Sequence, residues 1–421
     1  MSLPSQYLSD RLSLTGLDNQ LDEMTLEFQQ NLHRFAVDVL RPIGSELDRM
    51  SPEAVIAEGS PYWQVWTEFQ KLGASFSLLY SLDPLQGARI MSVMLEELTW
   101  GDAGLAISLG VSGTPWLLAH HFDNKFLLDN IPEDAIGCWG ITEPDHGSDM
   151  VDFNDVAMSP GSSQSRPNCI ATIKGDEVVI NGQKSAWVSN GTVAQYSALF
   201  CGCDRGNGLE KVALVVPLDA RGVIRGKPLD KLGQRALPQG EIYFDNVSIS
   251  TDWLIAPVEQ YKQVAYAQLA EANGGMGMMF AGLGRAAFEE ALNYAHERKQ
   301  GGVPIIEHPG VRAKLLHMFR KVEAARSLAR RNIEYNMCAQ EPALIGSISS
   351  KITSTQTAFE VASDALQLFG GNGMTLEYPV EKMLRDARVS MIEDGCNDVL
   401  AIKGGSELAQ SGLAAWQRRR G

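Results

Sequence analysis

The sequence lacks the features that mark disulfide-stabilised proteins and zinc proteins. Its six cysteines are scattered along 421 residues, so a framework of disulfide bonds is not expected. Cys201 and Cys203 stand close together, but no second cysteine pair and no His-x3-His motif follows them. Two thiolates cannot complete the four-ligand shell of a zinc ion, so we predict no metal site.

Long apolar runs and concentrated positive charge are also missing. No uninterrupted apolar segment reaches the length of about 20 residues that a membrane-spanning helix needs. The N-terminal segment has neither the basic start nor the apolar stretch of a signal peptide. The only concentrated basic run is Arg418 to Arg420, which reads as a solvated tail, and the net charge of -15 would repel a nucleic-acid backbone. We therefore expect a cytoplasmic protein with no membrane insertion and no nucleic-acid partner.

The composition is that of a large globular protein. Hydrophobic residues make up 44% of the chain and eight residues are tryptophan, so the chain can bury several cores. Its length favours two or three domains. Apolar residues recur at helical spacing from about Asp18 to His121, and again from about Tyr261 onward.

The segment between these helical regions has a different pattern. Short runs rich in β-branched and aromatic residues, such as KVALVVPL and EIYFDNVSI, alternate with Gly, Asn, Asp and Pro, which predicts a small all-β domain. Within it, the polar Ser- and Pro-rich segment 158–168 is expected to be a surface excursion. We predict a helical domain at 1–136, a β domain at 137–255 and a helical domain at 256–421.

Regular strand–helix alternation is absent, which argues against a parallel nucleotide-binding sheet. Gly282, Gly284 and Ala287 match the spacing of a dinucleotide fingerprint, but they stand in the middle of a helical stripe rather than after a strand. We interpret these residues as small contacts that let helices pack closely. A nucleotide cofactor would have to bind by another route.

Three separate segments carry the groups that such a cofactor and its chemistry need. GITEPDHGSDM, residues 140–150, offers hydroxyl groups and glycine backbone in a turn, which suits a planar ring or a phosphate. INGQKSAWVSNG places Trp187 and Ser189 two residues apart on one side of a strand. The third segment, residues 367–398, runs from a helix end through a glycine-rich turn to an acidic Glu393-Asp394-Gly395 turn.

Taken together, these segments resemble the acyl-CoA dehydrogenase family over nearly the whole chain. TEPDHGSD is similar to that family's TEPGAGSD loop, NGQKSAWVSNG to its NGxKxWITNG strand, and GGNGMTLEYPVEKMLRDAR to its GGxGxxxEYPVERxxRDAR segment. The resemblance implies a mainly α fold with a β domain: an N-terminal helical domain, a middle β-barrel and a C-terminal four-helix bundle. It also implies bound FAD, a homotetramer or dimer, and an electron-transfer flavoprotein as electron acceptor.

The resemblance also implies which residues contact the flavin and the substrate. Arg298 would bind the pyrophosphate through bidentate hydrogen bonds, although from the sequence alone it could equally be an exposed cation at a helix end. From the middle domain the expected flavin contacts are Trp139, Ile141, Thr142, Gly147, Ser148, Trp187 and Ser189. From the C-terminal region, in part from a neighbouring subunit, they are Arg298, Gln300, Ile305, His308, Gln367, Gly371, Cys396 and Asp398. The expected substrate contacts are Ser148, Asn273 and Gly395.

Four positions depart from the family pattern. Asp394 stands where most members carry the glutamate that removes the substrate α-proton, and its side chain is shorter by one methylene, about 1.5 Å. Glu393 could take this role instead if the alignment shifted by one residue. Asn273 replaces an arginine that lies near CoA in many relatives, Glu271 stands one position from an alternative base, and Pro309 replaces a common glutamine.

The reaction implied by the resemblance is FAD-dependent α,β-dehydrogenation of an acyl-CoA thioester, with Asp394 as the catalytic base. Aspartate occurs at this position in relatives that oxidise alicyclic acyl-CoA thioesters and in nitroalkane oxidases, so a cyclic or branched acyl group is expected. Two alternatives stay open. One is a flavin oxidase or monooxygenase of a non-CoA substrate such as a nitroalkane, and the other is a non-catalytic flavoprotein.

Overall fold

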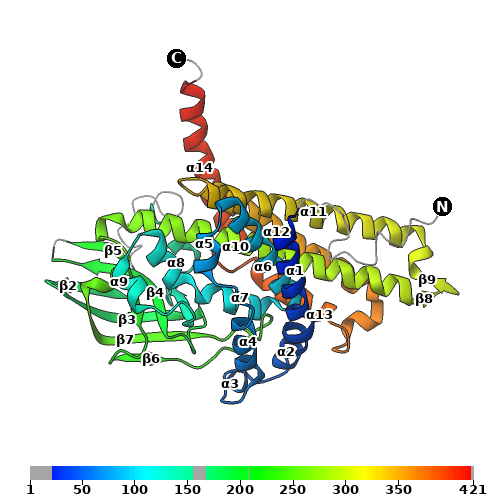
Figure 1. Ribbon diagram of the computed structural model, residues 1–421, viewed down its shortest axis with the longest axis horizontal. Coiled ribbons are helices and arrows are strands. Elements are labelled where there is room, and N and C mark those ends of the chain that lie inside the picture. Colours follow the sequence, from blue (N-terminus) through cyan, green and yellow to red (C-terminus); the bar gives the residue numbers. More distant parts are fainter. Residues whose placement is uncertain (1–20, 155–166, 207, 419–421) are drawn as a thin grey trace.

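The computed structural model describes residues 21–154, 167–206 and 208–418. Most of the predicted surface excursion at 158–168, together with Arg419 and Arg420, lies outside these described residues. The described chain runs from helices through a mixed sheet to long helices, in the order that the sequence pattern predicts (Figure 1). No helix in these ranges combines the length and apolarity that crossing a membrane requires.

The N-terminal region is helical, and side-chain caps start most of its helices. Asp22, Asp83, Asp102 and Asn124 each accept a hydrogen bond from a backbone N–H of the first turn, which satisfies a donor that has no partner inside the helix. The elements are α1 (Glu23–Phe35), η3 (Ala36–Leu40), α2 (Arg41–Leu47), α3 (Pro52–Val55), α4 (Pro61–Gln70), α5 (Phe76–Ser81), α6 (Pro84–Gly101), α7 (Ala103–Ser112), α8 (Thr114–His121) and α9 (Lys125–Asn130).

The middle region is a seven-stranded mixed sheet with the order β1-β4-β2-β3-β7-β6, in which β5 also pairs with β4. Strand β4 runs parallel to β1 and β2, and the other pairs are antiparallel. The strands are β1 (Gly137–Gly140), β2 (Ile170–Lys174), β3 (Glu177–Ser189), β4 (Tyr196–Asp204), β5 (Leu209–Pro217), β6 (Val223–Arg225) and β7 (Gln239–Ser250), with the short helices η4 (Ser148–Val151) and η5 (Thr251–Trp253) beside them.

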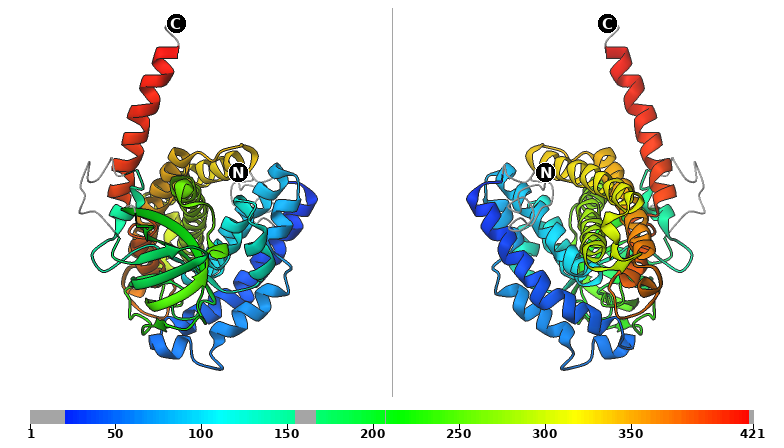
Figure 2. Two further views of the ribbon diagram at one scale, coloured as in Figure 1. Left: turned by 90° about the vertical axis from the view of Figure 1, so that its left-hand side faces the viewer. Right: turned by 90° about the vertical axis from the view of Figure 1, so that its right-hand side faces the viewer.

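The C-terminal region is built on long helices. The longest is α10 (Tyr261–Glu297), which follows η6 (Val258–Gln260) and packs against both α12 and the N-terminal helix α6. The remaining elements are β8 (Lys299–Gln300), β9 (Val303–Pro304), η7 (Ile305–Glu307), α11 (Pro309–Cys338), α12 (Leu344–Phe369), η8 (Gly370–Met374), α13 (Val380–Ser390) and α14 (Asn397–Arg418). Helix α14 extends away from the body of the molecule (Figure 2).

Close helix packing explains Gly282, the first glycine of the motif that imitates a dinucleotide fingerprint, whereas a Cβ atom at Gly284 would meet no atom closer than 3.6 Å. Gly282 lies inside α10, and a Cβ atom there would stand only 2.3 Å from the carbonyl oxygen of Glu96 in α6. A glycine is therefore required by the approach of the two helices, as we predicted. One continuous apolar core joins the N-terminal helices to the C-terminal helices, and two further apolar clusters involve the sheet.

Candidate active site

The acidic turn follows α13 and adopts a strained backbone. Asp394 has φ of 50° and Gly395 has φ of 90°, so two consecutive residues lie in the left-handed region. For a residue other than glycine this conformation costs on the order of 1 kcal/mol or more and persists only where the surroundings hold it.

Three side chains from distant elements hold this turn. Asn273 Nδ2 in α10 donates to the carbonyl oxygen of Asp394 at 3.2 Å, and Lys351 Nζ in α12 donates to the carbonyl oxygen of Gly395 at 2.9 Å. Ser148 Oγ accepts a hydrogen bond from the backbone N–H of Cys396 at 3.0 Å. The last contact joins the TEPDHGSD loop to the acidic turn, so it brings the first and third predicted segments together.

Asn273 and Glu271 point in different directions. Asn273 is fully buried against the acidic turn, so its observed role is to hold the Asp394 backbone, and direct contact with substrate stays a prediction. Residues two apart on a helix are separated by about 200°, which turns Glu271 toward Tyr80 of α5, where its charge raises the pKa of the tyrosine. Glu271 therefore faces away from the acidic turn.

The two carboxylates of the turn have different environments. Burial raises the pKa of both, that of Glu393 to about 7. Glu393 Oε2 accepts a hydrogen bond from Gln234 Nε2 at 3.0 Å. Among the described residues, no hydrogen bond reaches the carboxylate of Asp394. Glu393 is thus tied to the protein, whereas the oxygens of Asp394 are available to a ligand.

Lys351 places a positive charge directly beneath the turn. Its side chain is fully buried, and its ammonium group donates to the Gly395 carbonyl and to Asn397 Oδ1 at 2.8 Å. Burial lowers the pKa of Lys351 to about 8, and the charge of Asp394 opposes this shift. In return, Lys351 limits the rise in the pKa of Asp394. Lys351 stands on the apolar face of the amphipathic helix α12, and a lysine in that position is a sequence signal for a buried functional group.

The acidic turn is one wall of the site. The TEPDHGSD loop and the end of β3, with Trp187 and Ser189, form the second wall, which we call the flavin wall. A buried ion pair between Lys184 Nζ and Glu143 Oε1, at 2.6 Å, fixes the loop to β3. Beyond Lys184 the register of β3 against β7 shifts, because Lys184 faces Ile242 whereas Val188 faces Gly240. Such bulges re-aim side chains next to functional sites. Here Trp187 is 60% exposed while Val188 is buried.

This wall fits a flat ring with hydrogen-bond acceptors. The indole of Trp187 offers an exposed aromatic face, and Trp139 Nε1 is buried without a hydrogen-bond partner among the described residues. Ser189 is partly exposed beside Trp187, and its Oγ accepts from Gln239 Nε2 at 3.1 Å, which leaves its own proton free. The isoalloxazine ring of FAD has the shape and the acceptor atoms that these groups require.

The family resemblance assigns six of the expected contacts to the adenosine diphosphate portion of FAD, and these residues lie away from the acidic turn: Arg298, Gln300, Ile305, His308, Gln367 and Gly371. Arg298 and Gln300 stand at the end of α10 beside the β8–β9 hairpin, at the opposite end of the molecule from the sheet (Figure 1). The nearby chain brings four of the six together: the N–H of Ile305 donates to Arg298 O at 2.8 Å, and His308 contacts the carbonyl oxygen of Gln300. Gln367 in the last turn of α12 and Gly371 in η8 lie two residues before and after Phe369, which stacks on Tyr294 of α10.

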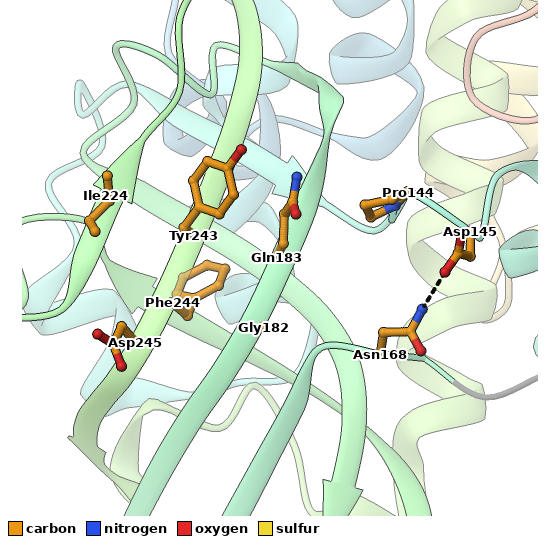
Figure 3. Close-up of a pocket in the computed structure, with 9 residues that line it drawn as sticks. All are labelled: Pro144, Asp145, Asn168, Gly182, Gln183, Ile224, Tyr243, Phe244 and Asp245. Atoms are coloured by element: carbon orange, nitrogen blue, oxygen red, sulfur yellow. Dashed lines mark hydrogen bonds between the residues drawn. The ribbon is translucent and has the colours of Figure 1, made fainter.

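Two further hollows lie apart from the acidic turn. An open groove of about 630 Å³ is lined by residues of β3, β6 and β7 together with Pro144, Asp145 and Asn168. Figure 3 shows these residues, with the hydrogen bond that Asn168 donates to Asp145. An apolar cavity of about 510 Å³ lies among the N-terminal helices α4 to α7, with Phe69, Phe76 and Leu98 in its wall. Asp394 lines neither hollow.

Comparison with known proteins places this arrangement in one family. Residues 138–247 match the family model "Acyl-CoA dehydrogenase, middle domain", and residues 263–406 match "Acyl-CoA dehydrogenase, C-terminal domain". The short-chain specific acyl-CoA dehydrogenase of Clostridium acetobutylicum is 29% identical over 89% of this chain and 96% of its own length. The 3-(aryl)acrylate reductase of Clostridium sporogenes is also 29% identical, over 74% of this chain and 80% of its own.

Solved structures show the same fold. Butyryl-CoA dehydrogenase from Megasphaera elsdenii superposes with a TM-score of 0.79 at 25% identity, covering 93% of this chain and 99% of that one. Glutaryl-CoA dehydrogenase from Mycobacterium smegmatis, solved in complex with FADH2, superposes with a TM-score of 0.77 at 22% identity, covering 94% of this chain and 97% of that one. The chain therefore belongs to the acyl-CoA dehydrogenase family of FAD-dependent oxidoreductases.

Proposed function

We propose that this protein catalyses the α,β-dehydrogenation of an acyl-CoA thioester, with Asp394 as the base that removes the α-proton. The observation that carries this proposal is the difference between the two partly buried carboxylates, Glu393 and Asp394. The carboxylate of Asp394 accepts no hydrogen bond from the described residues, whereas that of Glu393 is held by Gln234. Ser148 joins the Asp394 turn to the loop that we assign to the flavin.

The acidic turn supplies two groups to the reaction. Burial raises the pKa of Asp394, which makes its carboxylate a stronger base than an exposed aspartate. Its backbone N–H has no partner among the described residues, so it can donate to the thioester carbonyl as negative charge develops there. When bound, the flavin supplies the hydride acceptor for the β-carbon. We further propose an electron-transfer flavoprotein as the final electron acceptor.

The short side chain of Asp394 affects which acyl groups the site can accept. A base one methylene shorter than glutamate leaves additional space beside the α-carbon, about 1.5 Å deep. We expect flavin reduction to be faster with α-branched or alicyclic acyl-CoA than with butyryl-CoA or octanoyl-CoA, as measured by anaerobic stopped-flow absorbance. Equal or faster reduction by the straight chains would remove the steric argument and leave the dehydrogenase proposal in place.

A second candidate function rests on Asn273. This residue stands where many relatives carry an arginine near CoA, and its amide is occupied by the Asp394 carbonyl. A non-CoA substrate such as a nitroalkane, oxidised through loss of its acidic α-proton to Asp394, is compatible with that replacement. Mixing the oxygen-free holoenzyme with a panel of acyl-CoA thioesters and simple nitroalkanes separates the candidates. Bleaching by thioesters alone supports the dehydrogenase, bleaching by nitroalkanes alone supports the oxidase, and bleaching by neither favours a non-catalytic flavoprotein.

The distance between the two groups of expected flavin contacts supports an oligomeric assembly. Arg298 follows Asn273 by 25 residues along α10, which at 1.5 Å per residue separates them by about 37 Å. One extended FAD is shorter than this distance. We therefore propose that Arg298, Gln300 and His308 contact the FAD of a neighbouring subunit in a homotetramer or dimer.

Arg298→Ala tests this arrangement. The substitution removes a charge-assisted contact to the pyrophosphate, and such contacts contribute about 1.5–3 kcal/mol, so we expect FAD affinity to fall about 10- to 150-fold. Isothermal titration of the apoprotein measures the change, and the melting temperature of the apoprotein should stay the same. Lys299→Ala, at an exposed neighbour on the same hairpin, is the matched control. Unchanged FAD affinity in Arg298→Ala would contradict the proposed contact.

A further inference from the structure

A chain of three side chains leads from Lys231 to the exposed edge of the flavin wall. Lys231 Nζ donates to Gln239 Oε1 at 2.8 Å and to the carbonyl oxygen of Leu237 at 2.8 Å. Gln239, which is only 5% exposed, donates through Nε2 to Ser189 Oγ at 3.1 Å and to Trp187 O at 3.3 Å. Ser189 itself is partly exposed beside Trp187. None of our sequence-based expectations included Lys231 or Gln239.

The direction of every hydrogen bond in this chain is fixed by chemistry. A lysine ammonium group can only donate, so the oxygen of the Gln239 amide must face Lys231. The amide nitrogen must then face Ser189 and Trp187, and the carbonyl oxygen of Trp187 can only accept, which requires the same orientation independently. Ser189 Oγ therefore accepts from Gln239, and its single proton is left to be donated to another acceptor.

We propose that Lys231 is a positioning residue that acts through Gln239 to make the Ser189 hydroxyl a hydrogen-bond donor to the flavin ring. Without Lys231, the Gln239 amide loses one of the two contacts that fix its orientation. If the amide turned over, its oxygen would accept the Ser189 proton. The donor to the flavin would then be lost although Ser189 itself was unchanged.

The network also couples the two walls of the site. Lys231 lies near the charges of Glu393 and Asp386, and Gln234 on the same segment donates to Glu393. The segment Lys231 to Gln239 thus touches both the flavin wall and the acidic turn. Burial lowers the pKa of Lys231 to about 8, and the charges of Glu393 and Asp386 oppose this shift.

Gln239→Glu is the most direct test because it preserves the shape of the side chain and reverses one hydrogen bond. The introduced carboxylate can accept from Lys231 and from Ser189, but it cannot donate to Ser189. The Ser189 proton should then turn inward. We expect FAD affinity to fall about three- to tenfold, which corresponds to one neutral hydrogen bond, and the visible absorption band of bound FAD to shift. Lys231→Met should produce a change in the same direction.

A double-mutant cycle with Ser189→Ala separates this role from general stabilisation. If Lys231 and Gln239 act through the Ser189 proton, then Gln239→Glu and Lys231→Met should leave the FAD affinity and spectrum of Ser189→Ala unchanged. A merely structural network would lower the melting temperature by the same amount in both backgrounds and leave the flavin spectrum of the single variants like that of the parent. That result would overturn the inference.

The inference rests on the proposed placement of the flavin against Trp187 and Ser189, and the same cycle distinguishes the two failures. If Ser189→Ala alone leaves FAD affinity and spectrum unchanged, the placement is wrong. If Ser189→Ala alters them while Gln239→Glu and Lys231→Met do not, the placement stands and the role of Lys231 is wrong. These measurements use bound FAD and the melting temperature, so they do not depend on knowing the substrate.

Discussion

Asp394→Asn is expected to lower the rate of flavin reduction by substrate about a hundredfold to ten-thousandfold, the usual effect of losing a positioned general base. The substitution replaces one oxygen by an amide nitrogen and keeps the volume of the side chain. The contacts that hold the turn use the backbone of Asp394, Gly395 and Cys396, so they should survive. FAD should therefore remain bound, and rapid-mixing absorbance under anaerobic conditions measures the reduction rate directly.

Glu393→Gln is the matched control for this prediction. Its carboxylate accepts from Gln234 and lies on the same partly buried turn, so the substitution also neutralises one charge there. We expect a much smaller loss of flavin reduction than in Asp394→Asn. If instead Glu393→Gln abolishes reduction and Asp394→Asn does not, the base is Glu393 and our alignment is wrong by one residue.

The pH dependence follows from the same carboxylate. A general base must be ionised, so the rate of flavin reduction falls as pH drops through the pKa of Asp394. Burial raises this pKa above its ordinary value, and the charge of Lys351 limits the rise. The acid limb of the rate profile should consequently lie at higher pH than the titration range of an exposed aspartate. Asp394→Asn should abolish that limb, which a purely structural role would not do.

Local sequence patterns were sufficient to predict the order of the elements. Apolar residues recur every second residue in the strands and every third or fourth residue in the helices. The glycine pair after Phe369 ends α12, and Gly370 has φ of 60°. Helix packing also explains Gly282 without any ligand. The resemblance to a known family was needed to assign the fold, because patterns alone do not determine how three regions pack together.

The residues that hold the site in place could not be predicted from local sequence patterns. Lys351, Gln234 and Gln239 reach the site through contacts that span 44 to 159 residues of sequence, as in Lys351 to Gly395 and Gln234 to Glu393. A buried lysine or glutamine carries no local signal of its partner, since the partner is chosen by tertiary packing. The strained backbone of Asp394 was likewise hidden, because aspartate is compatible with both ordinary and left-handed conformations.

A buried cluster of charged side chains joins the N-terminal helices to the C-terminal helices. We expect the loss of one of its charges to lower the free energy of unfolding strongly. Arg285 of α10 is 3% exposed and pairs with Glu97 of α6 at 2.7 Å and with Glu96 beside it. Arg326 and Arg330 of α11 also reach Glu96. Both glutamates are fully buried, so their charges are stabilised by these cations rather than by water.

Arg285→Met is expected to destabilise the protein by about 3–5 kcal/mol, because it leaves a buried carboxylate without its main cation. Methionine keeps much of the apolar volume of the arginine stem, so lost packing contributes little. Lys314→Met breaks a partly exposed ion pair with Asp364 and is the matched control, with an expected cost of at most about 1 kcal/mol. Denaturant unfolding of the two variants and the parent measures the difference.

The pH dependence of that difference identifies its cause. Burial opposes ionisation of Glu97, but Arg285 and its other partners hold the pKa of this glutamate below its ordinary value. A lowered pKa contributes stability that is present above the pKa of the unfolded glutamate and is lost as pH falls through the pKa of the folded one. The cost of Arg285→Met should therefore be greatest near neutral pH and shrink as the solution is acidified, because protonation relieves the uncompensated carboxylate. If the loss of stability in Arg285→Met were the same at every pH, the effect of Arg285 would come from packing and not from its charge.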